Sequence, residues 1–454
     1  MGGMSFPSDT IAALATPVGT SAFAVVRVSG AQVAELIGAI FRKTPLPRVA
    51  RHADYRAKGG ELVDDVLFTY FAGPNSFTGE DSLEISCHGN PFIAQKILED
   101  LFALGCVPAE AGEFSKRAFL NGRLALSEAE AIMDLIHARS ERALAAANQQ
   151  LRGALERKMS DLISILINVL AKIEAYIDFP DEDLPDEDRE MVLAQLEKLM
   201  AGTRQLLATS HYGELLRDGI KTIILGEPNA GKSSLLNQLV GRDRALVSAE
   251  PGTTRDYLEE RIIVGPHWLR LIDTAGLNPA PGVIERRGIE KTFEQADAAD
   301  LFLWVVDSSR AIPSLPELLG RRMTPANTIL VYNKADLAGG FEKVEEDEGF
   351  PNVRVSALHG TGLDALRQEI IKLAESFQAS VGDDLIAINA RHAHALEQAL
   401  ICLEAAIVKV RANVSSELVS SDLRGVVEFF GQISGKIDSE RMLDQLFAMF
   451  CIGK

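Results

Sequence analysis

A phosphate-binding loop between a strand and a helix constrains the fold of this chain more than any other feature. Residues 226–233 read GEPNAGKS, matching the pattern GxxxxGK[ST], and they follow the apolar run KTIIL at 221–225. Such a loop turns successive backbone N–H groups toward one point, and the dipole of the following helix adds positive charge there. The pattern predicts a phosphate site in which Lys232 reaches the β- and γ-phosphates and Ser233 ligates Mg²⁺. The alternative is a glycine-rich turn that binds nothing.

Four more apolar runs follow this loop at intervals that leave room for helices. They are WLRLID at 268–273, LFLWVVD at 301–307, TILVYN at 328–333 and VRVSA at 353–357. Apolar strands that alternate with helices indicate a parallel sheet covered on both faces. We therefore expect an α/β nucleotide domain over residues 219–378.

The ends of these runs carry the remaining nucleotide chemistry. Asp273-Thr274-Ala275-Gly276 can hold Mg²⁺ through water and sense the γ-phosphate with a glycine amide. Thr253 and Thr254 lie in the preceding loop, and Thr254 is the natural second Mg²⁺ ligand, although a threonine pair taken singly is usually just a turn.

Guanine is the base that the later motifs select. Asp336, in the run NKAD at 333–336, can accept from both N1–H and the 2-amino group of guanine, donors that adenine lacks. A backbone amide in Ser356-Ala357-Leu358 can meet guanine O6. Motifs in this order predict a GTP-binding domain.

The composition bounds the class of protein. The chain has 454 residues, 47% of them hydrophobic and 24% charged, which is typical of a globular protein with several domains. Its four cysteines (Cys87, Cys106, Cys402 and Cys451) form no CxxC pair, so a zinc ribbon or a disulfide framework is not expected.

The start, MGGMSFPSDT, has no signal-peptide pattern and no run of eighteen apolar residues occurs, so we expect a cytoplasmic protein with no membrane contact. The net charge of −18 would repel the phosphates of a nucleic acid. If the chain binds nucleic acid, it must therefore use a local patch, a partner protein or a small nucleotide ligand.

The patterning predicts three further segments around the nucleotide domain. Residues 1–122 show strand-like runs (22–28, 66–71 and 83–87) and one helix at 91–104, which indicates a mixed α+β domain. Residues 123–218 change to a helical period, with one long amphipathic helix expected over 151–177. The helical period returns in 379–454, over 385–410 and from 421 to the last residue, so we expect the two helical segments to pack together.

Six short motifs outside the nucleotide domain carry a resemblance to a known family. They are ATPVG at 15–19, RVSG at 27–30, FTGED at 77–81, CHG at 87–89, GEFS at 112–115 and CIGK at 451–454. With the nucleotide motifs, these make the chain similar throughout its length to the tRNA modification GTPase family MnmE, also called TrmE, among the TrmE-Era-EngA-like GTPases.

The resemblance implies a homodimer whose N-terminal domain is similar to tetrahydrofolate-binding domains. It implies GTP hydrolysis and work with a flavoprotein partner, MnmG (GidA), which carries FAD, in a heterotetramer-type complex. Together they would add an aminomethyl-type group (carboxymethylaminomethyl) at C5 of the wobble uridine, position 34, of certain tRNAs. The one-carbon unit would come from a tetrahydrofolate in its 5,10-methylene or 5-formyl form.

The resemblance also assigns residues to the folate site. Arg27, Glu84, Arg123 and Lys454 would bind folate, although by themselves Glu84 and Arg123 would be interpreted as ordinary surface residues. Arg123 is commonly lysine in the family, and Thr20–Ala22 depart from a glycine-rich stretch often found there. Cys451 would be either a catalytic thiol or a residue that packs beside Phe447 and Phe450.

Hydrolysis in the family depends on K⁺ and on a glutamate. Leu277 stands where Ras-like enzymes carry a water-positioning glutamine, so another group must orient water. The resemblance implies that Glu285 does so and that K⁺ is held by Asn229, Ser248, Glu250 and Thr253. Lys232 would join Glu285 in catalysis. The full set of expected GTP contacts is Asn229, Ala230, Gly231, Lys232, Ser233, Ser234, Ser248, Ala249, Glu250, Pro251, Gly252, Thr253, Thr254, Asp273, Thr274, Ala275, Gly276, Asn333, Lys334, Asp336, Ser356, Ala357 and Leu358.

Two other functions compete with this interpretation. A ribosome-assembly regulatory GTPase would only control docking on RNA, but such proteins commonly add a KH module, and no GxxG loop occurs after residue 380. A scaffold with a vestigial GTPase domain is disfavoured by the intact set of nucleotide motifs.

Overall fold

The computed structural model describes most of the chain in two compact units. The described residues are 9–44, 46–178, 186–243, 259–273, 298–313, 317–337, 349–379, 386–435, 446–448 and 450–453. One unit combines residues 1–133 with 431–454, and the other comprises 134–430. The predicted domain boundaries at 122, 218 and 378 divide the chain more finely, and they stay predictions.

The N-terminal part of the first unit is a six-stranded sheet with the order β3-β4-β5-β2-β1-β6. Its strands are β1 (Ile11–Leu14), β2 (Phe23–Ser29), β3 (Arg51–Arg56), β4 (Leu62–Phe71), β5 (Ser82–His88) and β6 (Val107–Pro108). All pairings are antiparallel except that of β1 with β6. The predicted strands and the helix at 91–104 are present, while β1, β3 and a first helix had not been predicted.

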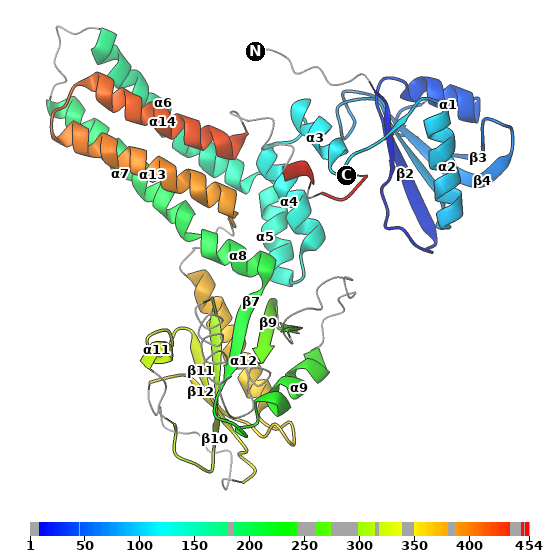
Figure 1. Cartoon of the computed structure of the whole chain (residues 1–454). Helices are drawn as coiled ribbons and strands as arrows, with labels where there is room; N and C mark the ends of the chain where they lie inside the picture. The colour runs from blue at the N-terminus through cyan, green and yellow to red at the C-terminus, as the bar shows by residue number, and fades with distance from the viewer. Residues whose placement is uncertain are drawn as a thin grey trace, which may run out of the picture. The chain divides into compact units, whose positions relative to one another are not determined.

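Helices α1 (Val33–Phe41) and α2 (Pro91–Ala103) cover one face of this sheet. Figure 1 labels β2, β3 and β4 of this sheet and the helices α1 and α2. Alternate strand residues such as Val26, Phe68 and Ile85 pack with the apolar side chains of both helices. The opposite face carries the row Ala13, Arg27, Glu84 and Thr69, which are cross-strand partners in that order. The sheet therefore presents Arg27 and Glu84 together, away from the helices.

The first unit continues with α3 (Glu113–Leu120) and the start of α4 (Leu126–His137). These helices share a core with Leu446, Phe447 and Phe450 from the end of the chain. The expectation of a helix to the last residue is wrong, because α14 ends at Ser434 before Gly435, whose φ is 74°. Residue Ile452 instead makes an antiparallel bridge with Ala111.

Four long helices form the bundle of the second unit, and Figure 1 shows them running alongside one another. They are α6 (Ala154–Asp178), α7 (Asp186–Ala208), α13 (Ala390–Arg411) and α14 (Ser416–Ser434), so the two predicted helical segments do pack together. Ion pairs join neighbours, as between Arg411 and Glu197 at 2.7 Å and between Arg424 and Glu174 at 2.9 Å.

Predicted helix starts in this bundle are wrong: the helix expected from 385 begins at Ala390, and the helix expected from 421 begins at Ser416. The expected helix beginning at 151 is broken at Gly153, whose φ is 75°, and Leu151 ends a separate helix, α5 (Glu141–Leu151). A positive φ interrupts a helix and is adopted readily by glycine alone.

The second unit also contains the predicted α/β domain, which α8 (Ser210–Asp218) precedes. Its sheet has the order β12-β11-β10-β7-β9-β8, parallel except for β8, which had not been predicted. The strands are β7 (Ile220–Leu225), β8 (Glu259–Val264), β9 (His267–Asp273), β10 (Leu301–Asp307), β11 (Thr328–Asn333) and β12 (Asn352–Arg354). The helices described around it are α9 (Lys232–Asp243), α11 (Glu317–Gly320) and α12 (Leu363–Ala379).

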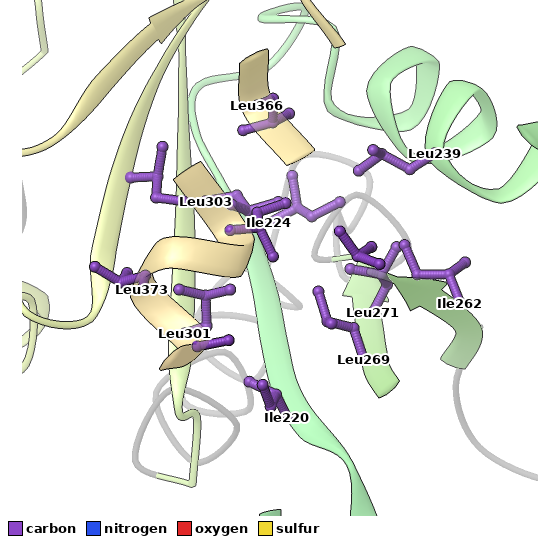
Figure 2. Close-up of a cluster of buried hydrophobic side chains, with 14 of the residues drawn as sticks. Ile220, Ile224, Leu239, Ile262, Leu269, Leu271, Leu301, Leu303, Leu366 and Leu373 are labelled. Atoms are coloured by element: carbon purple, nitrogen blue, oxygen red, sulfur yellow. The ribbon is translucent and has the colours of Figure 1, made fainter. Parts of the chain in front are cut away.

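Apolar side chains cover both faces of this sheet, as its continuous apolar runs predict. Figure 2 shows the core on one face, where Ile224 and Leu303 of the sheet lie near Leu239 of α9 and Leu366 of α12. A second core on the other face contains Ile223, Phe302 and Trp304. The carboxyl ends of β7, β9, β10 and β11 therefore meet along one edge of the sheet.

Within the described residues, no helix is long and apolar enough to cross a membrane.

Candidate nucleotide and folate sites

Two glycines fix the path of the predicted phosphate loop. A Cβ on Gly226 (φ 149°) would lie 2.1 Å from the Val305 carbonyl oxygen, and a Cβ on Gly231 (φ 93°) would lie 2.1 Å from Asn333 Nδ2. Any side chain at either position would collide with β10 or with the end of β11. The loop can therefore pass this close to both strands only because these residues are glycine.

Lys232 begins α9 and folds back over the loop. Its Nζ donates to the carbonyl oxygens of Gly226 and Glu227, both at 2.8 Å, and the residue is only 7% exposed. Ser233 and Ser234 follow it and are exposed, while Ala230 is buried. A lysine held by neutral carbonyls beside an exposed hydroxyl at a helix start is a donor set that fits a phosphate and its Mg²⁺.

Asn333, at the end of β11, joins the phosphate loop to the predicted guanine loop. Its Nδ2 donates to the Ala230 carbonyl at 2.8 Å, and its Oδ1 accepts from the Ala357 backbone N–H at 2.9 Å. The side chain is 2% exposed. One buried amide thus sets the spacing between the two loops that a nucleotide would have to contact at once.

Asp336 is exposed on the loop after β11 and is oriented by a buried serine. Ser356 Oγ donates to Asp336 Oδ1 at 2.6 Å, and this hydrogen bond is the main cause that lowers the pKa of Asp336 below its usual value. The carboxylate is therefore ionised at neutral pH. An oriented, ionised acceptor fits the paired donors of a guanine edge. In the predicted guanine loop, Leu358 is 75% exposed, whereas the neighbouring Ala357 is buried.

Sequence reasoning did not identify Asp307 as part of this edge. Lys334 Nζ donates to Asp307 Oδ2 at 2.7 Å, and this contact is the first cause that holds the pKa of Asp307 well below its usual range. Lys334 adopts a left-handed conformation, with φ of 62°. The position of Asp307 at the carboxyl end of the run LFLWVVD was the signal that could have revealed it.

Asn229 is exposed at the tip of the phosphate loop, with φ of 66°. Its side-chain amide makes no hydrogen bond to the residues that the structure describes. An amide oxygen of this kind fits K⁺, the ion that the resemblance implies there.

Several predicted site residues lie outside the described part of the chain. They are Ser248, Ala249, Glu250, Pro251, Gly252, Thr253, Thr254, Thr274, Ala275, Gly276, Glu285 and Lys454. Of Asp273 only the backbone is described, and it pairs with Ile224 at the carboxyl end of β9.

Arg27 and Glu84 of the predicted folate site form a direct ion pair. The Nε and Nη2 atoms of Arg27 donate to Glu84 Oε1 at 3.1 and 2.8 Å. The guanidinium lies 5.7 Å from the ring centroid of Phe77 and 5.8 Å from that of Phe114. Within the described residues, Glu84 Oε2 accepts no hydrogen bond. A carboxylate with one oriented oxygen available fits the adjacent N–H donors of a pterin.

The end of the chain reaches this ion pair. Arg27 Nη1 donates to the Gly453 carbonyl at 3.3 Å, and a Cβ on Gly453 would lie 2.4 Å from the Leu14 carbonyl oxygen. Lys454 is the next residue along the chain. Cys451 is exposed, whereas Phe447 and Phe450 are buried, and the two alternatives for its thiol, catalysis or packing, stay predictions.

Arg123 is exposed, and within the described residues its guanidinium has no hydrogen bond. A Cβ on Gly79, in the FTGED motif, would lie 3.1 Å from Arg123 Cγ, so the stem of Arg123 rests on this glycine. A residue that sequence reasoning missed supports the same loop: Arg117, 2% exposed, contacts Glu80 at 3.1 Å and Glu113 at 2.7 Å. The run EFSKR at 113–117 gives no signal that this cation is buried.

Comparisons with known proteins identify the family of the chain. The family of GTP-binding protein TrmE N-termini matches residues 10–123, and the MnmE helical domain matches residues 126–451. The tRNA modification GTPase MnmE of Opitutus terrae is 57% identical over 98% of this chain and 99% of its own length. That of Akkermansia muciniphila is 42% identical over 99% of this chain and 100% of its own length. Among solved structures, the G domain of the T. maritima FeoB iron transporter is 27% identical, covers 34% of this chain and 98% of its own, and has a TM-score of 0.25.

The predicted combination of an N-terminal TrmE-type domain, a helical domain and a P-loop GTPase-type domain is thereby confirmed. The chain belongs to the MnmE (TrmE) family of tRNA modification GTPases.

Proposed function

We propose that this chain is a cytoplasmic GTP hydrolase that works in the modification of the wobble uridine of certain tRNAs. Acting as a homodimer with an FAD-carrying MnmG-like flavoprotein, it would help to add the carboxymethylaminomethyl group to C5 of uridine 34. The support for tRNA as substrate is the relationship, at 57% identity over 98% of the chain, to a protein named for this activity.

The observation that carries the nucleotide half of the proposal is the bridging position of Asn333. Its amide contacts Ala230 of the phosphate loop and Ala357 of the guanine loop. A ligand that fills both loops must carry phosphates at one end and a base at the other. The ionised Asp336 then favours guanine over adenine, because adenine would leave the carboxylate without a donor.

The residues of this chain would divide the work of hydrolysis as follows. Lys232 would neutralise the β- and γ-phosphates, and the hydroxyls of Ser233 and Thr254 would hold Mg²⁺. That ion, when bound, would offset the charge that develops on the phosphate oxygens. The carboxylate of Asp273 would fix Mg²⁺ through water, and the amide of Gly276 would contact the γ-phosphate.

Water must be oriented by a residue other than Leu277, which can neither donate nor accept. We propose Glu285 for this role. We also propose that Asn229, with Ser248, Glu250 and Thr253, holds K⁺, which would supply the positive charge that an arginine finger supplies in other GTPases. The exposed amide of Asn229 supports its place in this set.

The Arg27–Glu84 pair supports a one-carbon tetrahydrofolate, in its 5,10-methylene or 5-formyl form, as the second ligand. Glu84 Oε2 would accept from the pterin, while Arg27 holds the carboxylate in place through Oε1. Arg123 and Lys454 would attract the glutamate tail of the folate. The exposed thiol of Cys451 lies within the same tail and would be a candidate catalytic group.

The test is an analysis of tRNA nucleosides by mass spectrometry in a strain that lacks this gene. We expect the modified wobble uridines to disappear and to return when the wild-type chain is supplied. Unchanged wobble uridines would contradict the proposal and would favour a regulatory GTPase of ribosome assembly.

A further inference from the structure

The chain is strongly acidic, yet one segment of its N-terminal domain is strongly basic. Residues 42–58 read RKTPLPRVARHADYRAK, with six lysines and arginines against one aspartate, in a protein whose net charge is −18. The segment runs from the end of α1 through β3, which is an edge strand of its sheet. We call residues 42–58 the basic segment; residue 45 lies outside the described part of the chain.

Cations of the basic segment surround one polar cavity. The cavity, about 450 Å³, lies between the end of α1, the edge strand β3 and α2. Its charged lining consists of Arg42, Lys43, Asp54, Arg56, Lys58 and Asp100. A left-handed conformation at Arg42, with φ of 52°, turns the chain at the end of α1 so that Arg42 and Lys43 reach this cavity.

The positive charge of this cavity is only partly balanced by carboxylates. Lys43 Nζ donates to the His52 carbonyl at 3.0 Å and Lys58 Nζ to the Ala103 carbonyl at 3.4 Å, contacts that hold the ammonium groups without neutralising them. Arg42 has no side-chain hydrogen bond or ion pair within the described residues. Among the residues that the structure describes, Arg56 is the one lining cation that pairs with a carboxylate, that of Asp54.

Asp100, the remaining acid, is turned inward. It is 8% exposed, its Oδ2 accepts from the Tyr55 hydroxyl at 3.1 Å, and its Oδ1 accepts from the backbone N–H of Lys58 at 2.7 Å. Because both oxygens are already engaged, Asp100 supports the wall of the cavity and does not pair with its lysines.

Two more arginines extend the positive surface along the same segment. Arg51 donates to the Thr44 carbonyl at 3.1 Å, and Arg48 donates to the Asn75 carbonyl at 2.7 Å. Arg48 also lies 5.8 Å from the centroid of Phe71. The basic segment thus carries six cations, more than a single small anion needs, which favours a ligand with several phosphates.

We propose that the basic segment is the surface through which this chain contacts the phosphate backbone of tRNA. A polyanion gains affinity from cations that release its counterions, and backbone-bonded lysines can do this without first breaking an ion pair. The inference rests on the proposed tRNA function and goes further, because it assigns the RNA contact to the N-terminal domain. It also explains how a protein of net charge −18 can hold RNA.

The structure offers a competing explanation, since lysines and arginines on an edge strand also discourage it from pairing with another chain. Glutamates of opposite charge would preserve that protection but would repel RNA. Reversal of charge therefore separates the two explanations.

The first experiment labels exposed lysines of the full-length wild-type protein with an acetylating reagent, with and without bulk tRNA, followed by mass spectrometry. Lys43 and Lys58 are both exposed, and so is Lys198 on α7, which serves as the reference. We expect tRNA to protect Lys43 and Lys58 and to leave Lys198 unprotected. Equal labelling of all three lysines with and without tRNA would overturn the inference.

The second experiment measures tRNA affinity against salt concentration for Lys43→Glu/Lys58→Glu. The matched control is Lys198→Glu/Lys372→Glu, which makes the same charge change on the other compact unit. We expect the first variant to lose at least about tenfold in affinity and to lower the salt slope by about two, while the control is unchanged. GTP hydrolysis and thermal unfolding should match wild type in both variants.

The outcomes distinguish this surface from the proposed function. Equal affinity and slope in the two double variants would overturn the surface, even if deletion of the gene removes the wobble modification. Unchanged wobble uridines in the deletion strain would instead contradict the proposed function, and protection of Lys43 and Lys58 by tRNA would still support the surface. If Lys43→Glu/Lys58→Glu fails to fold, labelling of the wild-type protein decides.

Discussion

The guanidinium of Arg27 donates a hydrogen bond to the carbonyl of Gly453, a residue 426 positions further along the chain. The same guanidinium holds Glu84 with two hydrogen bonds. The last residues are therefore part of the site on the N-terminal sheet, and their placement depends on Gly453, which has no side chain to collide with Leu14. A ligand at Glu84 would meet residues from both ends of the protein.

Guanine selection is expected to depend on Asp336. Asp336→Asn replaces one carboxylate acceptor with an amide donor, which suits the 2-oxo group of xanthine, so preference should move from GTP toward XTP. Competition binding of the two nucleotides to the purified variant measures this. A variant that still prefers GTP would show that this loop does not read the base.

The buried amide of Asn333 offers a second test of the nucleotide site. Asn333→Ala leaves the Ala230 carbonyl and the Ala357 N–H without their partner, which should cost about 1–3 kcal/mol of unfolding free energy for each group left unsatisfied. GTP affinity should fall as well, because the spacing of the two loops is no longer fixed. Val408→Ala, at an exposed side chain of α13 away from the nucleotide loops, is the control. Wild-type stability and affinity in Asn333→Ala would contradict the bridging role.

Much of the nucleotide edge could be predicted from the sequence because its information is local. A glycine-rich loop between an apolar strand and a helix can adopt few conformations, and each later motif follows directly on a strand. The predicted Lys232, Asn333 and Ser356 indeed lie at the carboxyl edge of one sheet. Whether they bind GTP stays a prediction.

Contacts between distant segments could not be predicted in this way. Periodicity carries no information about a contact between Arg27 and Gly453, and only the family resemblance brought the tail to the N-terminal domain. Helix boundaries were also wrong at Gly153 and Gly435, because a positive φ at a glycine ends a helix even where the apolar period continues. The edge strand β3 was missed because its sequence, RHADYR, has little apolar alternation.

Glu285 is expected to position the attacking water. Glu285→Ala should retain GTP binding, because the phosphate and guanine loops are intact, and should lose about a hundredfold or more in turnover. Single-turnover hydrolysis and nucleotide affinity, measured on the same preparation, separate the two effects. Unimpaired turnover would remove Glu285 from the mechanism.

Potassium is expected to be required for hydrolysis. Replacement of K⁺ by Na⁺ at constant ionic strength should abolish most turnover, because the smaller ion would not fit the cage that we propose around Asn229. Asn229→Ala should be slow in both salts. Equal rates of the wild-type protein in the two salts would refute the cation assignment.

The central claim is that one chain unites a GTP site with a folate site used for tRNA modification, and deletion of Cys451–Lys454 tests it most directly. The deletion removes the Gly453 contact with Arg27 and leaves the nucleotide loops intact. The measurement is the wobble-uridine content of tRNA, by mass spectrometry, in a strain whose only copy is the truncated chain, together with GTP hydrolysis by the purified protein. The account predicts unmodified wobble uridines with nearly wild-type GTP hydrolysis. Loss of both activities would show that the tail serves folding. Full modification of the wobble uridines by the truncated chain would contradict the account.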